Sequence, residues 1–184
     1  MRNLKAIILD TSAFIQGFYT SDTDTNLYTT PLVITEIKEE LAKIRAQNWS
    51  RTGKLIIMRP TQKSLDHVKS QAKKSGDINY LSNTDLSILA LTHQLTIDGL
   101  TPILISDDYS IQNLADLMGL RARGMITRGI KQRLQWINYC PGCKKQYINT
   151  QKLKICSICG TKLKRKPVKK LKLAGNKLPK TDFR

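Results

Sequence analysis

The chain has 184 residues, of which 40% are hydrophobic, so it is long enough for one globular domain and a small second unit. This composition excludes a wholly disordered chain, and no apolar run approaches the roughly 20 residues of a transmembrane helix. The N-terminal apolar stretch is too short for a signal peptide and shows no small-residue cleavage site. We therefore expect a cytoplasmic protein without a membrane partner.

The net charge of +17 is unevenly distributed along the chain. Residues 1–131 contain 16 basic and 13 acidic residues, whereas residues 132–184 contain 15 basic residues and one acidic residue. A strongly basic segment attached to a nearly neutral unit indicates a polyanionic partner, most simply a nucleic acid. A solvated basic tail without a partner is the alternative interpretation.

The first 125 residues alternate between short apolar runs and segments with helical spacing. The runs predict strands at residues 6–9, 55–59, 102–106 and 120–125. The spacing predicts helices at residues 36–45, 62–74, 82–95 and 110–118. This alternation is typical of an α/β fold with a doubly wound parallel sheet and helices on both faces.

The rest of the chain is predicted to form three segments. Apolar residues at Ile126, Ile130, Leu134 and Ile137 indicate an amphipathic linker helix at 126–138. Residues 139–162 hold all four cysteines and form a second, smaller domain. Because residues 163–184 are dense in lysine and contain two prolines, we expect a flexible basic tail that binds phosphates.

The four cysteines form two CxxC pairs, namely Cys140 with Cys143 and Cys156 with Cys159. Each pair directs two thiolates at one point, and two pairs complete the tetrahedron that zinc prefers. Two disulfides are the alternative, which a reducing cytoplasm disfavours. Four protein ligands leave no position for water, so we expect one structural zinc ion in a zinc ribbon.

Carboxylates recur at the predicted carboxyl ends of strands and at the first turns of helices. Asp10 follows the first strand, Asp107 and Asp108 follow the strand at 102–106, and Glu36 and Asp85 open helices. Ligands of open α/β sheets bind outside the carboxyl ends of the strands. Converging carboxylates need a cation to stay ionised, and oxygen ligands favour Mg²⁺ or Mn²⁺, which can assist phosphodiester hydrolysis.

Each of these carboxylates also has a purely structural interpretation. Asp85 completes the capping-box pattern that begins at Ser82, and Asp107 or Asp108 could cap the helix near residue 110. Glu36 could lie on the surface of its helix. We base the metal-site hypothesis on the matching topological positions of the acids rather than on any one of them.

The acidic pattern resembles that of the PIN domain. The resemblance lies in Ile8–Phe14, Glu36, Asn83–Ala90 and Ser106–Tyr109, and covers about residues 5–125. It implies a metal-dependent ribonuclease with a doubly wound α/β fold. It also implies that Asp10, Glu36, Asp85 and Asp108 bind Mg²⁺ or Mn²⁺, with Asp107 as the alternative fourth ligand.

The order of segments narrows the resemblance further. A PIN-type unit, a linker, a four-cysteine ribbon and a basic tail together resemble the archaeal form of the Nob ("Nin one binding") family. This resemblance implies zinc at the four cysteines and endonucleolytic cleavage of precursor small-subunit rRNA at its mature 3′ end. The implied partners are that RNA, the pre-ribosomal small subunit and its assembly factors.

Three other functions fit parts of the pattern. A non-catalytic RNA-binding scaffold in pre-ribosomal particles would explain the ribbon and the charge, but not the converging acids. A toxin-type PIN ribonuclease would explain the acids, but not the ribbon. A ribbon-bearing DNA-binding or transcription factor also leaves the acids unexplained.

Overall fold

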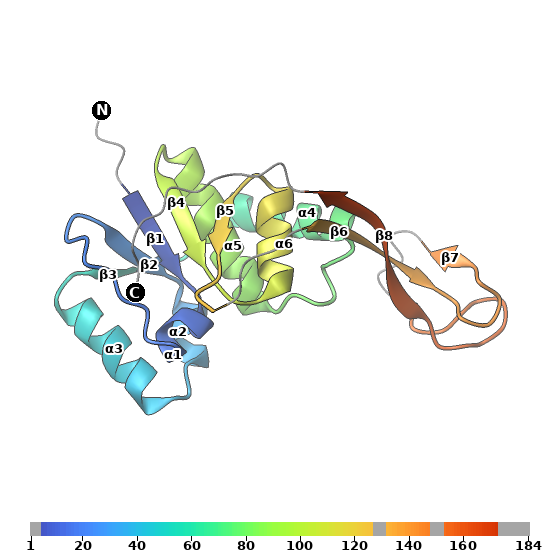
Figure 1. Ribbon diagram of the computed structural model, residues 1–184, viewed down its shortest axis with the longest axis horizontal. Coiled ribbons are helices and arrows are strands. Elements are labelled where there is room, and N and C mark those ends of the chain that lie inside the picture. The colour runs from blue at the N-terminus through green and yellow to red at the C-terminus, as the bar shows by residue number, and fades with distance from the viewer. Residues whose placement is uncertain (1–4, 127–131, 148–152, 173–184) are drawn as a thin grey trace.

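In the computed structural model of the chain, residues 5–126, 132–147 and 153–172 are described (Figure 1). The helices are α1 (Thr11–Ile15), α2 (Pro31–Glu36), α3 (Glu40–Arg51), α4 (Gln62–Ser75), α5 (Asn83–Ile97) and α6 (Tyr109–Leu117). The strands are β1 (Lys5–Leu9), β2 (Asn26–Thr29), β3 (Leu55–Ile57), β4 (Thr101–Ile105), β5 (Arg121–Arg123), β6 (Gln132–Tyr139), β7 (Gln146–Tyr147) and β8 (Lys164–Lys172).

Five strands form a parallel sheet in the order β3-β2-β1-β4-β5. The chain runs outward from β1 to β3 and then returns to β4 beside β1, so the topological switch point lies between β1 and β4. Because such crossovers are right-handed, the two directions place helices on opposite faces. Accordingly, α1 contacts α3, whereas α4, α5 and α6 contact one another (Figure 1). The expected doubly wound α/β fold is confirmed.

The core is centred on α5, which packs against α4, α2 and β4. Eight of its residues are buried, and they lie around the whole helix rather than along one stripe: Leu86, Ser87, Ile88, Leu89, Ala90, Leu91, Thr92 and Leu95. A helix that is apolar on all sides belongs in the interior. The predicted helix at 82–95 is therefore confirmed.

The region between the first and third strands of the chain differs from the sequence prediction. The predicted helix at 36–45 is split, because α2 ends at Glu36 and α3 begins at Glu40. Ile37 is buried at the break, whereas Leu41 and Ile44 are 59% and 44% exposed, so their shared spacing does not mark a core face. The short elements α1 and β2 were not predicted from the sequence.

The C-terminal region forms a second, antiparallel sheet in the order β7-β6-β8. The predicted linker helix at 126–138 is wrong for residues 132–138, which belong to β6. Ile137 and Trp136 suit a pleated strand as well as a helix, and the partner that decides for the strand lies about 30 residues away in β8. Residues 127–131 lie outside the described part of the chain.

The predicted flexible tail at 163–184 is wrong for residues 164–172, which form β8 along the full length of β6. Pro167 is compatible with this strand because β8 lies at the sheet edge and the register shifts at Gln135/Trp136, opposite the proline. Lysines are also common on edge strands, where they prevent further pairing. Residues 173–184 are outside the described residues.

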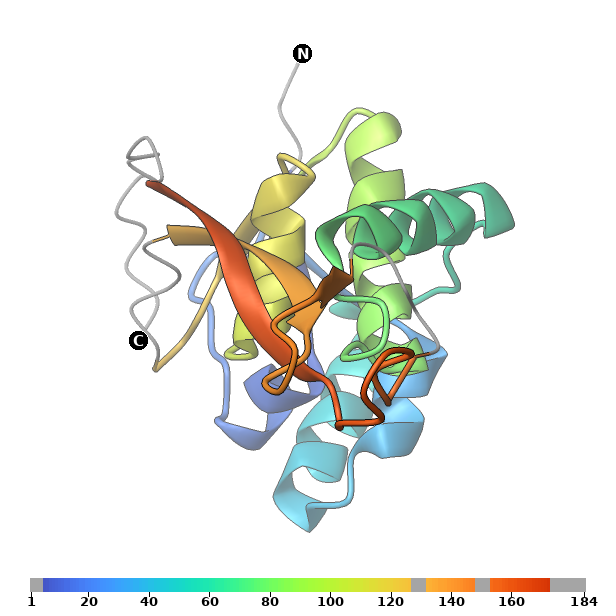
Figure 2. The same ribbon diagram turned by 90° about the vertical axis from the view of Figure 1, so that its right-hand side faces the viewer.

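The two sheets are joined through helices. Strand β6 contacts both α4 and α6, and the antiparallel pair of β6 and β8 extends from that side of the first unit (Figure 1). Seen from the side of the second sheet, β8 crosses in front of α6 (Figure 2). In the described residues, none of the helices is long and apolar enough to cross a membrane.

The central position of α5 gives a direct test of the fold. Leu89→Ala should lower the free energy of unfolding by about 2–5 kcal/mol, because it removes a fully buried side chain from a packed interior. Ile97→Ala, on the same helix but 65% exposed, should change it by less than about 0.5 kcal/mol. Urea denaturation of both variants measures the difference, and equal values would contradict the described packing.

Candidate active site and metal centre

Asp10 lies at the topological switch point of the parallel sheet. It follows β1 directly and is the N-terminal cap residue of α1, and its side chain is only 6% exposed. Strand β4 pairs with β1 and is followed by Ser106, Asp107 and Asp108. The two acidic segments are therefore neighbours at the carboxyl edge of the sheet, where ligands of such folds bind.

Two serine hydroxyls connect these neighbouring segments. Ser106 Oγ donates to Asp10 Oδ2 at 2.8 Å and accepts from the backbone N–H of Asp108 at 3.2 Å. Ser12 Oγ donates to the same Asp10 oxygen at 3.1 Å and accepts from the Asp107 backbone N–H at 3.3 Å. The position of Asp10 relative to the turn after β4 is thus fixed from both sides.

Glu36 reaches the site from the end of α2. Its Oε2 atom accepts a hydrogen bond from Thr11 Oγ1 at 3.4 Å, which places the carboxylate beside the start of α1. Helix α2 is itself held by Thr30, whose hydroxyl caps the helix and lies 2.9 Å from Ser87 Oγ of α5. This buried contact links the helix that carries Glu36 to the helix that carries Asp85.

Asp85 occupies the first turn of α5 in a complete capping box. Its Oδ2 atom accepts the Ser82 backbone N–H at 2.7 Å, and its own N–H donates to Ser82 Oγ at 3.1 Å. The structural interpretation of Asp85 is therefore correct. A carboxylate has two oxygens, however, so capping a helix and binding a cation are compatible roles.

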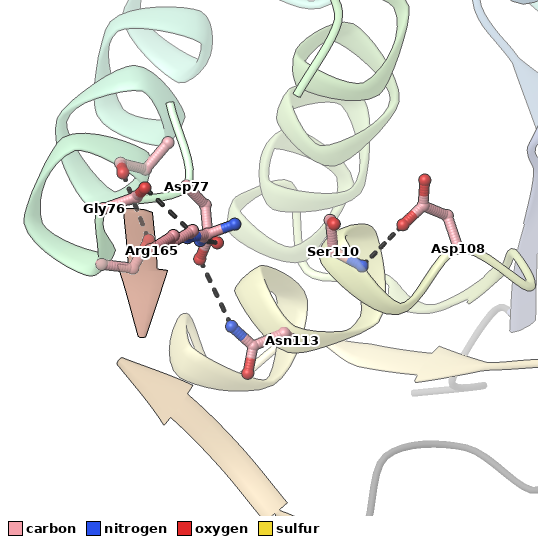
Figure 3. Close-up of polar contacts among 8 residues, drawn as sticks. Gly76, Asp77, Asp108, Ser110, Asn113 and Arg165 are labelled. Carbon is pink, nitrogen blue, oxygen red and sulfur yellow. Dashed lines mark hydrogen bonds and ion pairs between the residues drawn. The ribbon is translucent and has the colours of Figure 1, made fainter. Parts of the chain in front are cut away.

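Asp107 and Asp108 have different surroundings. Asp107 accepts the backbone N–H of Ile126 at 3.2 Å and so binds the segment that follows β5. Asp108 caps α6 by accepting the Ser110 N–H at 2.6 Å (Figure 3), and its charge acts on Asp85. Asp108 is therefore linked to Asp85 by charge and Asp107 to Ile126 by a hydrogen bond, and Asp108 stays the predicted fourth acid.

The carboxylates influence one another electrostatically. Burial is the main cause that raises the pKa of Asp10, against the hydrogen bonds from Ser106, Thr11 and Ser12, and the charge of Glu36 raises it further. Burial also raises the pKa of Asp85, with added contributions from the charges of Asp10 and Asp108. Repulsion of this kind is what a bound cation relieves.

The carboxylates are spaced more widely than the four cysteines. In the described segments, no set of three or more carboxylates brings its ligand oxygens within 4.8 Å of one another, whereas the four cysteines do. Mg²⁺ keeps several water ligands and typically takes only one or two protein carboxylates together with substrate phosphates. The acids can hold such an ion without all of them ligating it directly.

The four cysteines converge in the second unit. Cys140 Sγ lies 3.3 Å from Cys159 Sγ, Cys143 Sγ lies 3.4 Å from Cys156 Sγ, and none of the four is in a disulfide. In a tetrahedral Zn–S₄ site with bonds of about 2.3 Å, the sulfurs lie about 3.8 Å apart. The four thiols thus form a site for one metal ion.

Tyr147 of β7 supports one of these ligands. Its hydroxyl lies 3.0 Å from Cys156 Sγ and accepts the Ser157 backbone N–H at 3.2 Å. The hydrogen bond to Tyr147 is the main cause that lowers the pKa of the Cys156 thiol to about 5. This thiolate is therefore available for a metal at neutral pH.

Sequence reasoning did not assign roles to Ser106, Thr30 or Tyr147. Ser106 was included only as part of the segment that resembles the PIN pattern, and its hydrogen bonds to Asp10 and Asp108 were not predicted. Thr30 and Tyr147 gave no such signal, since their partners lie 57 and 9 residues away and act through the folded structure.

Comparison with known proteins agrees with this geometry. A family described as the PIN domain of ribonuclease matches residues 7–95, which contain β1 to α5 and three of the four converging acids. The parallel sheet with acids at its switch point therefore defines a PIN-domain protein of the ribonuclease class.

Curated relatives extend the match over most of the chain. "Endoribonuclease Nob1" of Pyrococcus abyssi is 36% identical over 86% of this chain and 91% of its own length. The protein of the same name from Methanocaldococcus jannaschii is 38% identical over 90% of this chain and 80% of its own length. The chain belongs to the Nob1 endoribonuclease family.

A eukaryotic relative matches about half of the chain. The "20S-pre-rRNA D-site endonuclease NOB1" of Saccharomyces cerevisiae is 38% identical over 97 residues, or 52% of this chain and 21% of the yeast protein.

The metal centre of the second unit predicts a local response to chelation. Removing metal with a strong chelator should unfold the region around Cys140–Cys143 and Cys156–Cys159, whose small buried cluster holds only two of these cysteines, Tyr147 and part of Leu163. The parallel sheet has its own core and should remain folded. Amide NMR spectra before and after chelation distinguish this outcome from no change or from global unfolding.

The raised pKa of Asp10 predicts that its carboxylate destabilises the metal-free fold at neutral pH. A carboxyl whose pKa is raised by folding stabilises the protein only when protonated, and that contribution is lost as pH rises through the raised value. Asp10→Asn should therefore raise the melting temperature of metal-free protein at pH 7, and the difference should shrink on acidification.

The control is Glu39→Gln, which removes one exposed charge and should change the melting temperature little. Mn²⁺ should raise the melting temperature of the unaltered chain more than that of Asp10→Asn. A less stable Asp10→Asn variant at pH 7 would show that the hydrogen bonds of Asp10 outweigh its burial.

Proposed function

We propose that this chain is a metal-dependent endoribonuclease that cleaves precursor small-subunit rRNA to form its mature 3′ end. The observation that carries the proposal is the convergence of Asp10, Glu36, Asp85 and Asp108 at the switch point of a Nob1-family chain. The name of the yeast relative supports the class of substrate.

In this proposal, Asp10, Asp85 and Asp108 hold one or two Mg²⁺ or Mn²⁺ ions, and Glu36 completes the site. When bound, such an ion lowers the pKa of water and neutralises charge that develops at a phosphodiester. Asp10 is positioned by Ser12 and Ser106, whose hydroxyls both donate to its Oδ2 atom. Glu36 lies at the exposed rim, where it can orient a water molecule.

Basic side chains near α2 and α3 support an RNA substrate. A groove between α2, α3 and the end of β3 begins next to Glu36, and its lining includes Lys38, Lys43 and Arg51. Cations in this position can bind the phosphates that flank the cleaved bond. The groove therefore offers one binding surface for single-stranded RNA.

The second unit supplies further contacts for RNA. We propose that its four cysteines bind one structural zinc ion, since four thiolates leave no open position. Exposed lysines flank the cysteines in the sequence, namely Lys144, Lys145, Lys154 and Lys162. Lys166 Nζ lies 5.0 Å from the centre of the Tyr139 ring. Lysines beside an aromatic ring suit phosphates and unstacked bases. The particle that presents the RNA would be the pre-ribosomal small subunit with its assembly factors.

The proposal is tested by incubating the chain with RNA that spans the mature 3′ end of small-subunit rRNA, with Mn²⁺. We expect one main cut at the mature end. Asp10→Asn should reduce the rate by at least about 10²-fold while RNA affinity changes little, because it removes a metal ligand and not the basic surface.

Asp107→Asn is the matched control, since it removes the neighbouring acid that binds Ile126 instead. It should retain most of the activity. Metal-independent binding without any cut, both on free RNA and on pre-ribosomal particles, would favour the scaffold alternative. A rate loss in Asp107→Asn as large as in Asp108→Asn would overturn the assignment of the fourth acid.

A further inference from the structure

A single arginine of β8 connects the second unit to the first. The Arg165 guanidinium forms an ion pair with Asp77, which follows α4 and is 1% exposed, and it donates to the Gly76 carbonyl oxygen at 3.4 Å (Figure 3). The Arg165 side chain is itself only 16% exposed. This contact is therefore a buried ion pair between the two units rather than a surface contact.

Two aromatic rings enclose the same guanidinium. Its central carbon lies 3.8 Å from the ring centre of Tyr80, in the first unit, and 4.1 Å from that of Trp136, in β6. A planar guanidinium can stack on rings and pair with a carboxylate at once, which an ammonium group cannot do. We name this arrangement of Arg165, Asp77, Tyr80 and Trp136 the arginine clasp.

The backbone at Gly76 brings β6 against the first unit. Gly76 ends α4 in the left-handed region with φ +81°, and a Cβ atom there would lie 2.7 Å from the Trp136 carbonyl oxygen. Only glycine permits this approach without a shift of the strand. The clasp is therefore supported by shape as well as by charge.

The clasp lies between the metal centre and the acids. Trp136 precedes Cys140 by four residues of strand, or about 13 Å. On the other side, Asn113 Nδ2 of α6 donates to Asp77 Oδ2 at 3.3 Å, and α6 begins at the cap residue Asp108 (Figure 3). The segment that holds Asp77 and Tyr80 leads directly to Ser82 and the cap of Asp85.

We propose that Arg165 is a positioning residue, and that the arginine clasp holds the four-cysteine unit at a fixed orientation to the carboxylates. This inference rests on the proposed function where it concerns cleavage. An RNA segment bound by the second unit then lies at a set distance from Asp10, so the clasp selects which phosphodiester is cut. Loss of the clasp leaves the acids intact but lets the two units reorient.

The test compares Arg165→Met with Lys164→Met in the full chain. Both variants remove one positive charge from β8, but only the first opens the clasp, because Lys164 is exposed. On RNA spanning the mature 3′ end, we expect Lys164→Met to make a single cut with a higher KM. Arg165→Met should spread the cuts over several phosphodiesters, while its rate on a short single-stranded RNA stays within about twofold. Equal cut distributions in both variants would overturn the proposal.

A measurement without RNA tests the arginine clasp independently of the proposed nuclease activity. In ¹⁵N relaxation of the unaltered chain, two groups of amides are compared: those of β1 and β4 in the first unit, and those of β6 and β7 in the second. Both groups should give the same rotational correlation time. In Arg165→Met, the second group should report a shorter one. Two separate correlation times in the unaltered chain would contradict a fixed orientation, whatever the nuclease assay shows.

Glycine substitutions provide an independent variant if Arg165→Met does not fold. Gly76→Ala and Gly99→Ala place alanine at similar φ values of +81° and +85°, but only the first meets another strand. Gly76→Ala should therefore spread the cuts and split the correlation times, and Gly99→Ala should do neither. Identical behaviour of the two variants would overturn the role of this contact.

Discussion

The candidate site depends on the hydrogen bonds between the ends of β1 and β4. Ser106 Oγ binds Asp10 and the backbone of Asp108 at once, and this joins two segments that lie 96 residues apart in the chain. Parallel pairing of β1 with β4 brings the segments together, and the serine fixes their side chains. The other two acids are added by helices α2 and α5, which are themselves linked through Thr30 and Ser87.

The same acids serve the fold and the proposed chemistry. Asp85 and Asp108 each cap a helix, so their positions are set by backbone N–H groups before any metal binds. Asp10 is held by hydroxyls in a buried place that raises its pKa. The cost of collecting negative charge at this edge is offset when a cation binds, which couples metal affinity to the stability of the fold.

The sequence predicted the α/β alternation and the cluster of four cysteines, because these features depend on local spacing. The acidic metal site stays a prediction. The sequence did not predict β6 and β8 as paired strands. Ile137 and Trp136 fit a helix or a strand, and Pro167 argued against any regular element. Both segments form strands because they pair with each other across about 30 residues of chain. The sequence also did not predict the partners of Arg165, since a lysine-rich stretch gives no sign that one cation is buried against Asp77.

We propose that Asp10, Asp85 and Asp108 surround a divalent cation. The most direct test of this proposal is anomalous X-ray diffraction from crystals of the full chain soaked in Mn²⁺. We expect a manganese peak about 2.1 Å from an oxygen of Asp10, on the side facing Asp85 and Asp108. A peak bound by Asp107 instead, or no peak at a manganese concentration that supports cleavage, would contradict it.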